Sequence, residues 1–136
     1  MDCLQLKLCD IQGRLFERSL AYASEEFIRD FMNSETARHL DSPYNKLHWM
    51  GEEYLLEELA EEKNLIPAGQ TFSPEVLYWT GYLYRFWACS RNEESRRIYR
   101  LAPAKTMKRN YLSLHTADPE LAIDDLLEIY RQRHQK

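Results

Sequence analysis

The segment at residues 74–89 constrains the fold of this chain more than any other part of the sequence. After its first turn it is apolar on every side of a helical wheel, and Arg85 is its single formal charge. A helix that is hydrophobic all round is normally buried at the centre of a protein. We therefore predict a central aromatic helix over 74–89. Because Gly81 lowers the helix propensity there, we expect another helix to approach it closely.

Signals for helix starts recur along the rest of the chain. Ser73–Glu75 and Asp118–Glu120 each place an N-cap residue before a proline, which loses no hydrogen bond at the first helical position. Sustained period-2 alternation, the signal of strands, is absent. We therefore predict an all-α fold, a compact bundle of about six to eight helices in one domain spanning residues 1–136. The expected helices are 3–22, 25–32, 35–40, 43–63, 74–89, 92–101, 103–115 and 119–133.

Composition excludes several classes of protein. A chain of 136 residues with 44% hydrophobic content buries a core without disulfide or metal support. Cys3, Cys9 and Cys89 match neither a secreted disulfide framework nor a chelating C-x-x-C spacing, so we interpret them as reduced thiols. The N-terminus has no signal-peptide pattern, and the most apolar window, Val76–Cys89, is too short to span a bilayer. We expect a soluble, cytoplasmic protein with no membrane partner.

Charge is distributed unevenly along the chain, although the net charge is only −4. Residues 1–63 contain 14 acidic and 7 basic side chains, whereas residues 64–136 contain 8 acidic and 11 basic ones. An acidic half and a mildly basic half suggest a dipolar surface, which would orient a binding partner.

Two charges lie where a helical wheel places apolar side chains. Glu52 interrupts the apolar stripe of the predicted helix 43–63, and Arg85 lies in the central helix. Burying either charge alone is prohibitive, so each needs a partner. We predict that Glu52 and Arg85 pair across a helix interface, with His48 or a tyrosine such as Tyr82 completing the cluster. Two interpretations stay open: a purely structural ion pair, or a small-ligand-binding or enzymatic pocket.

Recognisable catalytic chemistry is missing from the sequence. No nucleophile has a diagnostic surround such as G-x-S-x-G, and no phosphate loop is present. His48 and Glu52 are spaced i, i+4 but lack a further ligand motif such as H-E-x-x-H. We therefore predict no catalytic residue, no cofactor and no metal site, and favour a non-enzymatic role over an enzymatic one.

A basic stretch with interleaved tyrosines lies between residues 91 and 109. Its candidate contact residues for nucleic acid or for a protein partner are Arg96, Arg97, Arg100, Lys108 and Arg109. Such a patch is typical of surfaces that meet phosphate backbones, but it equally fits a solvated face or a docking surface for an acidic partner. Because the chain is acidic overall, we rank nucleic-acid binding third among the functional hypotheses.

Three segments together resemble an uncharacterised family of small all-helical Firmicutes-type proteins. The segments are Leu47–Leu55, Val76–Trp87 and Met107–Ile123. The resemblance implies a location near toxin–antitoxin-like genes, including ADP-ribosyltransferase-like ones, and supplies no catalytic residue or cofactor. Our first hypothesis is therefore a non-enzymatic protein–protein interaction module, an antitoxin-like or regulatory partner of a bacterial toxin. A pocket around Glu52 and Arg85 is the alternative.

Overall fold

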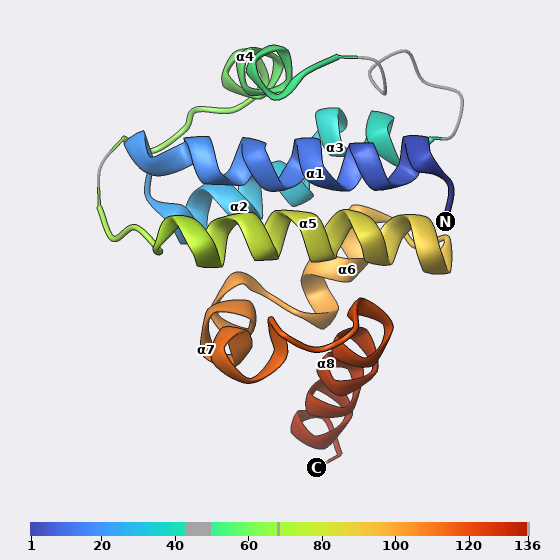
Figure 1. The fold of residues 1–136 in the computed structure, drawn as a ribbon. Coiled ribbons are helices and arrows are strands. Elements are labelled where there is room, and N and C mark those ends of the chain that lie inside the picture. The colour runs from blue at the N-terminus through green and yellow to red at the C-terminus, as the bar shows by residue number, and fades with distance from the viewer. Residues whose placement is uncertain (43–49, 68, 136) are drawn as a thin grey trace.

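The computed structural model describes residues 1–42, 50–67 and 69–135 of the chain. This described part is all-helical (Figure 1), as the sequence predicts. The elements in chain order are α1 (Cys3–Glu17), the 3₁₀ helix η1 (Arg18–Ala21), α2 (Ser24–Met32), α3 (Glu35–Asp41), α4 (Glu52–Glu62), α5 (Pro74–Arg91), α6 (Ser95–Leu101), α7 (Ala104–Leu114) and α8 (Pro119–Arg133).

Helix α5 is central, as predicted, and α1 lies antiparallel along most of its length (Figure 1). The close approach expected at Gly81 is confirmed, because a Cβ atom there would stand 2.5 Å from the backbone oxygen of Gln12. Gly13 on α1 permits the same close approach, because a Cβ atom there would stand 2.8 Å from the ring of Tyr78 on α5. Helices α6, α7 and α8 pack on other parts of α5.

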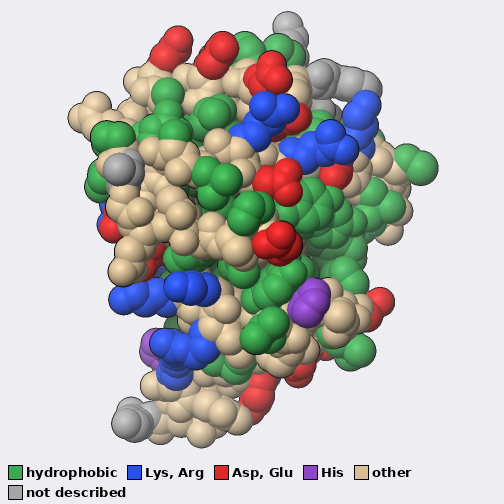
Figure 2. All heavy atoms as spheres, turned by 60° about the vertical axis from the view of Figure 1, so that its left-hand side comes forward, with side chains coloured by type: hydrophobic (Ala, Val, Ile, Leu, Met, Phe, Trp, Pro, Cys, Tyr) green, Lys and Arg blue, Asp and Glu red, His purple; other side chains and the backbone are tan. Residues whose placement is uncertain are grey.

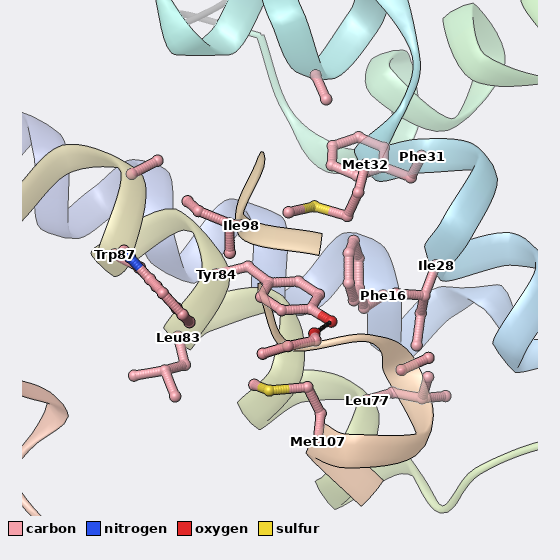
Figure 3. Close-up of a cluster of buried hydrophobic side chains, with 14 of the residues drawn as sticks. Phe16, Ile28, Phe31, Met32, Leu77, Leu83, Tyr84, Trp87, Ile98 and Met107 are labelled. Atoms are coloured by element: carbon pink, nitrogen blue, oxygen red, sulfur yellow. Dashed lines mark hydrogen bonds between the residues drawn. The ribbon is translucent and has the colours of Figure 1, made fainter. Parts of the chain in front are cut away.

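The core is a cluster of aromatic and aliphatic side chains around α5 (Figure 3). Phe16 is at its centre and makes edge-to-face contacts with Phe27, Phe31 and Tyr84, at centroid distances of 5.3 to 6.2 Å. The buried hydroxyl of Tyr84 donates a hydrogen bond to the backbone oxygen of Ala102, so this polar group is satisfied inside the core.

Three predicted helix boundaries differ from the structure for local reasons. Residues 43–49 lie outside the described part of the chain, and α4 begins at Glu52 because Gly51 is its extended N-cap residue. The predicted helix 3–22 changes to a 3₁₀ helix after Glu17. The predicted start at residue 92 is three residues early, since Asn92 is left-handed (φ 51°) and ends α5. Among the described helices, none combines the length and apolarity that crossing a membrane requires.

Candidate functional site

Arg85 is buried, as its place in the apolar central helix predicts, and its side chain is only 1% exposed. Its Nε donates to Oε1 of Gln12 at 2.7 Å, its Nη1 to Oδ1 of Asp41 at 2.7 Å, and its Nη2 to Oγ of Ser95 at 3.1 Å. The expectation that a buried guanidinium requires a partner is therefore confirmed. The partners come from α1, α3 and α6.

The predicted partner of Arg85 is wrong. Glu52 lies 3.3 Å from Nε of Arg18, a half-exposed side chain at the end of α1, and not in the Arg85 network. The reason is the order of the helices: α1 lies between α4, which carries Glu52, and α5, which carries Arg85 (Figure 1). His48, the other proposed member of the cluster, lies outside the described residues.

Asp41, and not the predicted Glu52, is the carboxylate that pairs with Arg85. One oxygen of its carboxylate accepts from Arg85, and the other accepts from the backbone N–H of Ser95 at 3.0 Å, at the first turn of α6. The Ser95 hydroxyl also donates to Asp41, at 2.7 Å. One signal could have identified this residue: a carboxylate at the end of the predicted helix 35–40 faces the negative end of the helix dipole and needs compensation.

A cavity of about 180 Å³ lies beside this network. Arg85, Asp41 and Cys89 contribute to its wall, together with the apolar side chains of Leu8 and Leu40. Each nitrogen of the guanidinium already has a protein acceptor, so the network itself is a structural feature that joins four helices.

A more open groove of about 420 Å³ lies at the opposite end of α1, between α1, α5 and α7. We call it the aromatic groove, and it is lined by Glu17, Glu75, Tyr78, Trp79, Tyr82, Tyr111 and His115. Figure 2 shows a face of the molecule on which hydrophobic side chains form a continuous area bordered by carboxylates and a histidine. The structure places Tyr82 in this groove and not in the Arg85 network.

The aromatic rings that line the groove pack against one another. Trp79 and Tyr111 meet edge to face at a centroid distance of 5.7 Å, and Tyr111 stacks on His115 at 4.3 Å. His115 is held in addition by a 2.8 Å contact between its Nδ1 and the backbone oxygen of Tyr111. Rings that are fixed by their neighbours present a preformed surface to a ligand.

The negative charge of the aromatic groove comes from carboxylates and not from phenols. Burial, followed by a hydrogen bond to Asp10, raises the pKa of Tyr78, and burial raises the pKa of Tyr82, so both hydroxyls are protonated at neutral pH. Glu17 and Glu75 are exposed and have no ion-pair partner among the residues that the structure describes. Aromatic faces beside uncompensated carboxylates favour a cation.

The basic residues of the 91–109 stretch are all on the surface. Arg96, Arg97, Arg100, Lys108 and Arg109 are exposed. Arg97 pairs with Glu93 at 3.3 Å, and the Nζ of Lys108 lies 5.1 Å from the centroid of the Phe72 ring. Binding of nucleic acid or of an acidic partner through this stretch stays a prediction.

Comparison with known proteins adds no assignment, since no protein-family model, curated protein or solved structure matches the chain.

Proposed function

We propose that this chain is a non-enzymatic protein–protein interaction module that binds a basic segment of a partner protein in the aromatic groove. The observation that carries the proposal is the combination of aromatic rings with two carboxylates, Glu17 and Glu75, that lack a protein counter-charge among the described residues. A regulatory or antitoxin-like role in the cytoplasm is the form of this interaction that the family resemblance favours.

Arginine and lysine side chains match the chemistry of the groove. A guanidinium or ammonium group over an aromatic face contributes about 0.5–2 kcal/mol, and a neighbouring carboxylate adds a charge-assisted hydrogen bond. The openness of the groove suits side chains of a polypeptide better than a small molecule, because small-molecule sites normally enclose most of the ligand surface. The rings of Trp79 and Tyr111 supply the apolar contact that such an interface needs.

The proposal is tested with a double charge reversal in the groove, Glu17→Lys with Glu75→Lys. The probe is a set of fluorescein-labelled peptides that carry arginine and lysine, with acidic peptides of equal length as a second set, and binding is measured by fluorescence anisotropy. We expect the basic set to bind and the double variant to lose about tenfold or more in affinity, since about 1.4 kcal/mol corresponds to that factor.

The matched control is Glu57→Lys with Asp125→Lys, which changes the net charge equally at exposed positions on α4 and α8. This variant should bind the basic peptides with nearly unchanged affinity. Equal losses in both double variants would mean that overall charge and not the groove attracts the peptides. Failure of every basic peptide to bind at low salt would also contradict the proposal.

A further inference from the structure

Two cysteines that are far apart in the sequence lie together in the structure. Cys9 is on α1 and Cys89 is on α5, and their thiols are close enough that each shifts the pKa of the other. The antiparallel packing of the two helices produces this proximity, because Arg85, one turn before Cys89, donates a hydrogen bond to Gln12, which lies one turn after Cys9. The two thiols are therefore held as a pair by the same contact that organises the core.

The two thiols differ in their access to solvent. Cys89 is half-buried and forms part of the wall of the 180 Å³ cavity, whereas Cys9 is fully buried. A small reagent that enters the cavity therefore reaches Cys89 before the fully buried Cys9.

The charges around the pair also differ for the two thiols. Interaction with the neighbouring Cys9 thiol and the positive charge of Arg85 lower the pKa of Cys89 to about 7, against the effect of burial and of Asp41 and Asp2. Interaction with Cys89 and burial raise the pKa of Cys9 far above its usual value. The lowered pKa of Cys89 favours its thiolate, the nucleophilic form, and the raised pKa of Cys9 favours its protonated form.

We propose that Cys89 is a peroxide-reactive thiol and that Cys9 is its resolving partner, so that a hydroperoxide converts the pair into a disulfide between α1 and α5. The site is the cavity beside Arg85, and it is independent of the aromatic groove.

The reaction proceeds in two steps. The Cys89 thiolate attacks one oxygen of hydrogen peroxide, the O–O bond breaks, and the second oxygen leaves as hydroxide and takes up a proton to give water. Cys89 is then a sulfenic acid. The sulfur of Cys9 attacks the sulfur of Cys89, the S–O bond breaks, and the departing hydroxide takes the Cys9 proton as a second water. The two thiols are oxidised by two electrons, and the peroxide is reduced.

The experiment treats the folded, reduced protein with equimolar hydrogen peroxide and follows it by intact-mass measurement and by peptide mapping without reductant. We expect the wild-type chain to lose the mass of two hydrogen atoms and to contain a Cys9–Cys89 peptide, as a monomer. Cys3→Ser is the matched control and should behave like the wild type, since Cys3 is exposed and outside the pair.

Two variants separate the roles of the thiols. Cys89→Ser should form no intramolecular disulfide, and Cys9→Ala should accumulate a Cys89 sulfenic acid that dimedone traps. The peptide map of the oxidised wild-type chain tests the proposal even if a variant folds poorly. Oxidation confined to Cys3, a disulfide that involves Cys3, or a persistent Cys89 sulfenic acid in the wild type would overturn the proposal.

Discussion

At the scale of single residues, Arg85 shows how a buried charge organises its surroundings. Its guanidinium has a partner on each nitrogen, and two of these partners, Asp41 and Ser95, bond to each other as well. The total interaction energy of such a network contributes less to stability than the free-energy cost of leaving one of its buried members without a partner.

Replacement of Asp41 should therefore be far more damaging than replacement of Glu52. Asp41→Ala leaves the guanidinium of Arg85 without its counter-charge, and we expect a loss of about 3 kcal/mol or more in the free energy of unfolding. Glu52→Ala removes a contact with the half-exposed Arg18 and should cost less than about 1 kcal/mol. Urea denaturation of both variants measures the difference. Similar losses would show that Glu52 contributes as a buried charge after all.

At the scale of elements, the N-cap and proline signals located the starts of α5 and α8, because a cap acts through the backbone of its own helix. Ser73 accepts from the N–H of Val76, and Asp118 accepts from the N–H of Glu120. The residues at which the helices end depended more on hydrogen bonds from residues that follow the helix. The change at Glu17 was not predicted, and there the hydroxyl of Ser19 donates to the backbone oxygen of Phe16, which competes with helical hydrogen bonding.

The contact between α1 and α5 depends on the absence of a side chain at Gly81. Gly81→Ala would improve helix propensity by about 1 kcal/mol, but the new Cβ atom would stand 2.5 Å from the Gln12 backbone oxygen and 2.9 Å from the Phe16 ring. Because the backbone of Gln12 can move away only at a free-energy cost, we expect G81A to lower the free energy of unfolding by about 2 kcal/mol.

The matched control is Gly51→Ala, where a Cβ atom would meet nothing within 4 Å. Only the weaker N-cap preference of alanine then remains, and the loss should stay below about 1 kcal/mol. Thermal unfolding followed by circular dichroism compares the two variants. A G81A variant as stable as the wild type would mean that α1 and α5 separate without cost.

At the scale of the whole molecule, α5 is the element on which most of the others depend. It packs against α1 on one side and against α6, α7 and α8 elsewhere, so the acidic N-terminal half and the basic C-terminal half share its surface.

We expect unfolding in urea to be a single cooperative transition. Two of the three tryptophans, Trp79 and Trp87, are on α5, so tryptophan fluorescence reports mainly on this helix, while far-ultraviolet circular dichroism reports on all helices. If the chain is one domain, the two signals should give the same midpoint and the same slope. A second transition seen only by circular dichroism would indicate that one half unfolds independently, contrary to the prediction.

Local signals along the chain were sufficient to predict the all-α class, the positions of most helices, the central place of α5, the tight approach at Gly81 and the need of Arg85 for a partner. These follow from periodicity, capping and the cost of burying charge, which act within one helix. The packing of the helices was needed to show that the partner is Asp41, that Tyr82 joins Glu17 and Tyr111 in a groove, and that Cys9 lies near Cys89. A helical wheel tells which side of a helix is buried, but the identity of the opposite side chain depends on how helices distant in sequence cross and on their register.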